Sequence, residues 1–281
     1  MKKKVIAIGI VCLFLFTGLV TASATKIESN KSDLNKYENI ALLSPSVDYI
    51  PHEAIIIHGN DEFTTESGVT GGSGTQNDPY IIEGWEVCLI MIYDTTAYFV
   101  IRNCCVYGDR TGKFINVTNG VIQYTIFESN ELWGPSFKGS CSNVLEYCTI
   151  NNCTWGLMID GGSNNNEIHH CSITGKAAHW GICLTDSEDN NIHHNNIYDL
   201  EGGASYVSVI HHRMKSEGLL KNQWDSNYWG NYRGLRFKIF ADLDGDGFGN
   251  FPYPIVSIYN NNFFPRYYEW DRHPAMQPYQ L

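Results

Sequence analysis

The sequence is short of basic residues, of methionine and of long apolar runs, and each shortage excludes a class of protein. It has 19 Lys and Arg against 30 Asp and Glu in 281 residues, a formal net charge of −11. So acidic a chain is a poor partner for nucleic acid or anionic lipid. The five methionines form no cluster, which gives no support to a methionine-based Cu(I) site. Outside the N-terminal segment, no apolar run is long enough to cross a membrane.

The one long apolar run lies at the N-terminus. Residues 2–4 are lysines, residues 5–20 are largely apolar, and Thr-Ala-Ser-Ala follows, which is the pattern of a signal peptide over residues 1–24. We expect cleavage after Ala24 and export to the cell surface, the medium or a periplasm-like space; an uncleaved anchor is the alternative. Loss of the three lysines would bring the charge from −11 to −14. Residues 25–50 are polar and indicate a linker.

The rest of the chain has no run with the 3.6-residue apolar period of a helix, and it repeats a different pattern. An aliphatic residue, four mostly polar residues and a second bulky apolar residue recur six times. The pairs are Ile82/Val87, Ile101/Val106, Ile122/Phe127, Leu145/Ile150, Ile168/Ile173 and Ile192/Ile197. The interval between their first members lengthens slowly along the chain and stays below the length of a helix pair. This spacing, with β-branched residues between Asn- and Gly-rich turns, predicts an all-β parallel solenoid.

In such a solenoid, equivalent residues of successive coils fall into straight rows about 4.8 Å apart. Counting three residues on from each first member gives Trp85, Cys104, Thr125, Cys148, Cys171 and Asn195, which we expect to point inward at a turn. Cys148 and Cys171 would be direct neighbours, either bridged by a disulfide or buried as free thiols. A second strand recurs at residues 155–159 and 180–184. The solenoid is predicted over residues 51–221, and an aromatic-rich C-terminal cap over 222–281.

Several segments resemble one known family. The coil Asn190–Ile197, with the sequence NNIHHNNI, resembles the repeats of NosD-type right-handed β-helix proteins, and so do blocks at residues 59–85 and 227–253. The resemblance spans roughly residues 50–275. It implies a right-handed parallel β-helix like that of pectate lyases. It also implies a role in periplasmic copper supply, in carbohydrate binding or in sugar hydrolysis.

A row of polar residues directly follows the first member of each pair. The row is Glu83, Arg102, Gln123, Glu146, His169 and His193. If Ile210-His211-His212 is a further coil, His169, His193 and His211 stack beside Glu146 and form a candidate copper or zinc site. The alternative is that these are ordinary solvated outward positions.

A second candidate metal site lies in the predicted cap. Asp242, Asp244 and Asp246 alternate before Gly247, as in the first half of an EF-hand calcium loop. Tyr253 stands where the twelfth-position glutamate would be, so Asn250, backbone or water would complete the ligand set. The alternative is an Asp/Gly-rich turn without metal. With Ca²⁺ bound, the loop would stabilise the cap.

Exposed aromatic residues suggest a sugar-binding surface, and Trp133, Tyr124 and Tyr147 are the candidates for stacking. Acidic residues form no row on neighbouring coils, and the motifs of pectin hydrolases and lyases are not apparent. The sequence therefore favours an exported, non-catalytic envelope scaffold whose partner is a carbohydrate or another envelope protein. The alternatives are a copper-binding accessory protein and, after it, a polysaccharide lyase or glycoside hydrolase.

Overall fold

A computed structural model describes residues 48–129, 132–175, 180–200, 205–211, 222–232, 242–259 and 267–281. The chain separates into two units, residues 1–46 and 47–281, and every described residue belongs to the second. The predicted leader and most of the predicted linker therefore lie outside the described residues. Within the described part, no helix has the length and apolar character to span a membrane.

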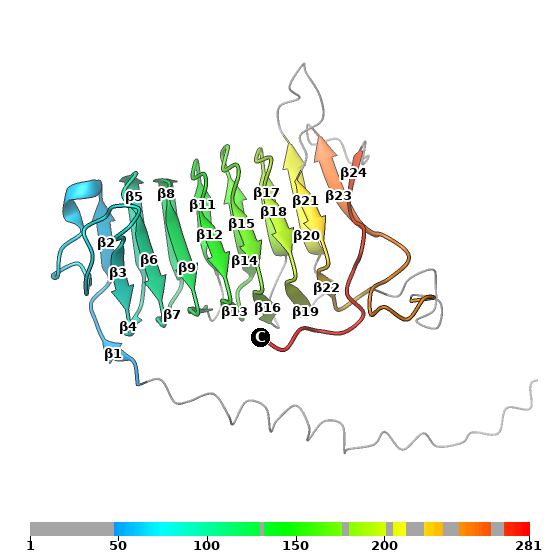
Figure 1. Ribbon diagram of the computed structural model, residues 1–281, viewed down its shortest axis with the longest axis horizontal. Coiled ribbons are helices and arrows are strands. Elements are labelled where there is room, and N and C mark those ends of the chain that lie inside the picture. Colours follow the sequence, from blue (N-terminus) through cyan, green and yellow to red (C-terminus); the bar gives the residue numbers. More distant parts are fainter. Residues whose placement is uncertain are drawn as a thin grey trace, which may run out of the picture. The chain divides into compact units, whose positions relative to one another are not determined.

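The described unit is built from coils of three short strands, and the strands stack into three rows (Figure 1). The first row is β1 (Ile50–Pro51), β4 (Trp85–Val87), β7 (Cys105–Tyr107), β10 (Ile126–Glu128), β13 (Thr149–Asn151), β16 (Ser172–Gly175), β19 (Asn196–Leu200) and β22 (Tyr228–Trp229). The second is β2 (Ile55–His58), β5 (Ile90–Thr95), β8 (Gly112–Val117), β11 (Ser136–Lys138), β14 (Trp155–Asp160), β17 (Trp180–Thr185), β20 (Ser205–His211) and β23 (Tyr253–Tyr259). The third is β3 (Tyr80–Glu83), β6 (Phe99–Arg102), β9 (Gly120–Gln123), β12 (Val144–Glu146), β15 (Glu167–His169), β18 (Asn191–His193), β21 (Gln223–Asp225) and β24 (Tyr267–Asp271). A 3₁₀ turn, η2 (Asn60–Glu62), follows β2.

The register confirms the predicted repeat. Ile82 pairs with Ile101 in the third row and Val87 with Val106 in the first, and the later members follow in the same order. All twelve residues of the predicted pairs are at most 1% exposed. Burial of these side chains from water is the main force that holds neighbouring coils together. Trp155 pairs with Trp180 as predicted for the second strand.

Buried asparagines join successive coils at the turns. The Asn190 side-chain oxygen accepts bonds from both the backbone N–H and the amide of Asn166, at 3.0 Å each, and the Asn190 amide donates to the Ser163 carbonyl. Asn166 accepts the same two bonds from Asn143, and Asn222 accepts them from Asn190. Such ladders satisfy the buried backbone groups that a turn inside a solenoid leaves unpaired.

The predicted inward row at the other turn is also buried from Cys104 onward. Cys148 and Cys171 are neighbours in it, and both are free thiols. Burial raises the pKa of the Cys148 thiol, and the hydrogen bond with Cys171 raises it further. These cysteines therefore act as small apolar core residues in the structure.

The strand register continues past Asn222, where the cap was predicted to begin. Trp224 pairs with Ile192 and Trp229 with Ile197, so two aromatic residues of the predicted cap occupy core positions of one more coil. β23 and β24 then pair antiparallel and connect the second row to the third (Figure 1). The last open strand edges of these two rows are thereby paired with each other.

Candidate binding sites on the coil surface

Two pairs of adjacent histidines lie on neighbouring coils at the ends of β15 and β18. His169 and His193 are in register, with ring centroids 5.1 Å apart and planes 9° from parallel. His170 and His194 follow them, with centroids 5.4 Å apart. Within each pair the rings are nearly perpendicular, at 87° and 89°. The four imidazoles thus form two columns, one pair per coil.

The ring nitrogens of each pair face each other. The two Nδ1 atoms form a hydrogen bond of 2.8 Å in His169/His170 and of 2.9 Å in His193/His194, so one nitrogen of each pair carries the proton. On the opposite side of each ring lies a carboxylate: His169 Nε2 is 3.4 Å from Glu146, and His193 Nε2 is 3.1 Å from Glu167. The side chains of His169 and His193 are 15% and 19% exposed, so solvent reaches this site.

The surroundings of His169, His170 and His194 favour the neutral imidazole. Partial burial lowers the pKa of His169, and the neighbouring His193 lowers it further, while Glu146 acts in the opposite direction. Burial and the adjacent histidines also lower the pKa of His170 and of His194. A neutral ring has a nitrogen lone pair to offer to a ligand.

His170 and His194 adopt left-handed backbone angles, with φ of 53° and 54°. This turn conformation recurs at Tyr124 and Tyr147 in the preceding coils, and the rings form one column with Tyr147 stacked on His170 at 4.9 Å. Tyr279, from the C-terminal segment, lies 5.5 Å from His194 at the other end. The row predicted from the sequence contains only the first histidine of each of these two pairs. The repeated His-His dipeptide, one coil apart, was the signal for this column.

The expectation that His211 continues the row below His193 is wrong. His193 pairs with Asp225 on β21, whereas His211 belongs to β20 and pairs with Tyr259 on β23. The coil after His193 is longer than its predecessors, because its next paired position is reached only at Asp225. Ile210 and His211 of the third Ile-His-His sequence therefore lie in a different strand row.

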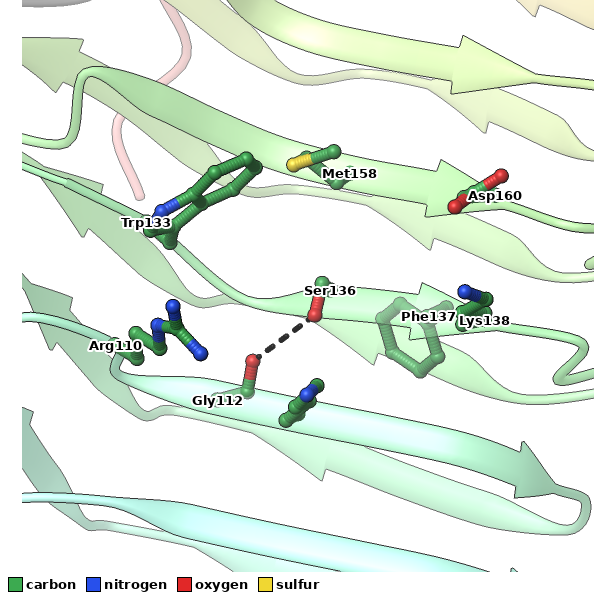
Figure 2. Close-up of a pocket in the computed structure, with 10 residues that line it drawn as sticks. Arg110, Gly112, Trp133, Ser136, Phe137, Lys138, Met158 and Asp160 are labelled. Atoms are coloured by element: carbon green, nitrogen blue, oxygen red, sulfur yellow. Dashed lines mark hydrogen bonds between the residues drawn. The ribbon is translucent and has the colours of Figure 1, made fainter.

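A separate open pocket of about 210 Å³ lies over β8, β11 and β14 (Figure 2). It forms where the small Ser136 stands between Lys113 and Met158 in the cross-strand register. Arg110 and Trp133 lie at one end, and Lys138 and Asp160 at the other (Figure 2). Ser136 Oγ donates a 3.4 Å hydrogen bond to the Gly112 carbonyl on the pocket floor.

This pocket gathers positive charge on an acidic protein. Three of the five lysines and arginines in the described residues line it, namely Arg110, Lys113 and Lys138. None of the three lies within 4.0 Å of a described carboxylate as an ion pair, whereas Arg102 on the third row is bound to Glu83 at 2.6 Å. The pocket therefore presents cations that are available to an anionic ligand.

The three residues predicted to stack on sugars differ in how much of each ring face is covered. Trp133 pairs with Arg110 on one side and with Trp155 on the other, and its ring stacks on Trp155 at 5.0 Å, so its second face is turned towards the Arg110 coil. Tyr147 is covered on both faces by Tyr124 and His170, so the expectation that it stacks on a sugar is wrong. Tyr124 is 53% exposed, and one face of its ring is stacked on Tyr147.

The predicted calcium-loop residues come together. Carboxylate oxygens of Asp242, Asp244 and Asp246 lie within 4.8 Å of one another. The Asp242 carboxylate accepts hydrogen bonds from the backbone N–H of Gly245 at 2.7 Å and of Gly247 at 3.1 Å. The side chain of Asn250 accepts from the Leu243 N–H, and its hydrogen bond to Asp244 lowers the pKa of that carboxyl. The atoms that these side chains can offer to a metal ion are oxygens, the ligand type that Ca²⁺ prefers.

Comparison with known proteins fits the architecture. Residues 88–219 match the family model described as right handed beta helix region. Together with the parallel strand rows, this match defines the fold as a right-handed parallel β-helix, as the sequence predicted. No curated protein and no solved structure matches the chain.

Proposed function

We propose that this protein is a non-catalytic scaffold of the cell envelope that binds an acidic carbohydrate in the pocket over β8, β11 and β14. The proposal rests on one observation: the pocket combines an aromatic ring face with three cations that have no described carboxylate partner. The predicted leader would bring the chain to the envelope, where acidic polysaccharides are available as ligands.

The chemistry of the pocket suits a uronic acid unit. The face of Trp133 that is not stacked on Trp155 offers an apolar surface to the C–H side of a sugar ring. Arg110 adjoins that ring, and Lys113 and Lys138 extend the positive surface along the pocket. Guanidinium and ammonium groups bind carboxylates through charge-assisted hydrogen bonds. The volume of about 210 Å³ is below the range of about 300–1,000 Å³ for larger ligands, which favours a single sugar unit of a chain.

The same pocket gives little support to hydrolysis. Glycoside hydrolases need two carboxyl groups on either side of the scissile bond. Of the residues that line this pocket, only Asp160 carries a carboxyl group. Binding without bond cleavage is therefore the function that we propose.

The test is direct binding of polygalacturonate, with a neutral glucan as the comparison ligand, by isothermal titration calorimetry at low and moderate salt. Wild-type protein should bind the acidic polymer, with affinity that falls as salt rises. Lys113→Ala should weaken binding about tenfold, which corresponds to about 1.4 kcal/mol. Trp133→Ala should weaken binding of the same polymer through loss of the ring surface.

Arg102→Ala is the matched control, because it removes one positive charge from the coil surface outside the pocket. It should bind polygalacturonate as the wild type does. Equal affinity for the neutral glucan, or equal loss in Lys113→Ala and Arg102→Ala, would contradict the proposed site. Release of shortened or unsaturated sugars on prolonged incubation would contradict the non-catalytic assignment.

A further inference from the structure

The geometry points to a transition-metal site made by the two histidine pairs: we infer that His169/His170 and His193/His194 each chelate one divalent ion through their Nδ1 atoms. This inference is independent of the carbohydrate pocket, which lies on a different strand row. It replaces the single row of His169, His193 and His211 with two adjacent pairs, and it gives Glu146 a supporting role.

The separation of the Nδ1 atoms is the first support. Imidazole nitrogens bind such metals at about 2.0–2.1 Å. Two nitrogens 2.8 or 2.9 Å apart can therefore bind one ion with an angle of about 90° between the two bonds. Right angles are typical of tetragonal Cu²⁺ and Ni²⁺ sites. A tetrahedral Zn²⁺ site would require each pair to open slightly.

The carboxylates on the far side of the rings are the second support. Metal-bound histidines usually donate their other ring N–H to a carboxylate, which fixes the ring and the tautomer. Glu146 and Glu167 hold this position against Nε2 of His169 and His193. With that proton on Nε2, Nδ1 of His169 and of His193 has a lone pair and accepts the hydrogen bond from Nδ1–H of the partner ring. An ion would replace the hydrogen-bonding proton of each pair, and His170 and His194 would then carry their proton on Nε2. The acidic side chains also attract a cation to this surface.

The backbone holds the second ligand of each pair. His170 and His194 occupy the left-handed turn position that repeats from coil to coil, and their rings are packed between Tyr147 and Tyr279. Ring orientation is therefore set before an ion binds, which reduces the entropy cost of binding. Water would fill the remaining coordination positions, since the rings lie at a solvent-accessible surface.

The experiment adds Cu²⁺ alone to the purified full chain, in competition with a chromogenic chelator, and measures stoichiometry and affinity. Wild-type protein should take up one ion per pair, with nitrogen hyperfine splitting in the EPR spectrum. His170→Asn and His194→Asn should each remove one ion, and the double variant should weaken binding at least 100-fold. Glu146→Gln should lower affinity about 10–100-fold while the nitrogen ligands stay in place.

Asparagine is the substitution of choice because it tolerates the left-handed backbone angles of these turns. Tyr124→Asn introduces asparagine at the equivalent turn position, away from the histidines, and should bind Cu²⁺ as the wild type does. A His211→Asn, His212→Asn variant removes the third His-His dipeptide and should also keep both ions. Retention of both ions by the His170→Asn, His194→Asn variant would overturn the inference. So would a loss of binding that follows only the change at residues 211 and 212.

Discussion

Two buried carboxylates end the asparagine ladders, and they do so with different geometry. Asp271 Oδ2 accepts from the Asn227 backbone N–H, the Asn227 amide and the Trp229 indole, and Oδ1 accepts a longer bond of 3.3 Å from the His273 backbone N–H. Glu269 uses both of its oxygens for the ladder: Oε1 accepts from Asn222, and Oε2 accepts from the Trp224 indole. Both carboxylates are almost fully buried, at 0% and 3% exposure. An amide at position 271 can keep the three ladder bonds and lose only the 3.3 Å bond from His273, whereas an amide at position 269 cannot keep the bonds from both Asn222 and Trp224.

We therefore expect Asp271→Asn and Glu269→Gln to differ in stability. In the Asp271→Asn variant, the oxygen of the new amide can still accept all three ladder bonds. Only the 3.3 Å bond from the His273 N–H is lost, and His273 is exposed. In Glu269→Gln, the new NH₂ must face either Asn222 or Trp224, and that buried donor is then unsatisfied at a cost of about 1–3 kcal/mol. Urea unfolding at pH 7 should show Asp271→Asn within about 1 kcal/mol of wild type and Glu269→Gln clearly less stable. Equal loss in both variants would show that the split of oxygens is irrelevant.

The same pair predicts a pH dependence. Burial raises the pKa of Asp271 above its ordinary value, and it outweighs the hydrogen bonds from Trp229 and Asn227 that lower it. An acid whose pKa is raised by folding contributes most stability below its unfolded pKa, and the contribution is lost as pH rises through the folded pKa. Wild type should therefore gain stability relative to Asp271→Asn when urea unfolding is repeated at pH 5. A constant difference between pH 5 and pH 7 would contradict this.

At the level of single residues, the sequence correctly predicted that His169 and His193 are neighbours and wrongly added His211 to their row. Residues of one row are fixed by counting within the repeat, so His169 and His193 were placed next to Glu146. Whether His170 turns away or back towards His169 depends on the left-handed turn and on stacking with Tyr147. Neither the turn conformation nor the stacking can be predicted from the spacing of the apolar residues.

At the level of elements, the number of residues per coil varies because the loops between the strands differ in length. The Asp242–Asn250 loop precedes β23. Its backbone N–H groups donate hydrogen bonds to Asp242 and Asp246, and the carboxylates of its three aspartates lie close together. Three carboxylates brought so close repel one another unless a cation or solvent compensates their charge. A Ca²⁺ ion would remove that repulsion and stabilise the approach to β23.

We propose that Ca²⁺ raises the melting temperature of the protein through this loop. Millimolar Ca²⁺ should raise the midpoint of thermal unfolding by several degrees, and removal with EGTA should reverse the change, because an ion that binds only the folded state stabilises it. Asp244→Asn should abolish most of the shift in differential scanning fluorimetry. Asp199→Asn changes an exposed aspartate outside the loop and should leave the shift intact. A shift of equal size in both variants would assign the effect to another site.

At the level of the whole molecule, a solenoid of this kind depends on how its last coil is closed. Each coil contacts only its neighbours, so the final strands would offer unpaired N–H and C=O groups to other chains. Here β24 pairs antiparallel with β23 and bridges to Trp224 of β21, while Ala275 pairs with Tyr228 of β22. The C-terminal segment thereby covers all three strand rows at this end.

Removal of residues 267–281 should therefore cause association. The truncated chain loses β24 and both ladder-ending carboxylates, and it exposes the edges of β21 and β23. Light scattering after size exclusion should show oligomers or aggregates of the truncated chain, with the full chain at the same concentration as the reference. Removal of Gln280 and Leu281 alone is the control and should not change the mass. A monodisperse 267–281 deletion with the mass of one chain would show that the end needs no cover.

The sequence by itself determined the coil, its register and the inward aliphatic rows, because each coil repeats the same burial requirement at the same positions. It also marked Asp242, Asp244, Asp246 and Asn250 as one group, since short spacing keeps them together. Only the tertiary structure decided which distant side chains meet. Glu269 and Asp271 reach Asn222 and Asn227 across 47 and 44 residues, because β24 returns antiparallel to the last coil. The basic pocket likewise depends on a small Ser136 between two long neighbours, a relation set by cross-strand register.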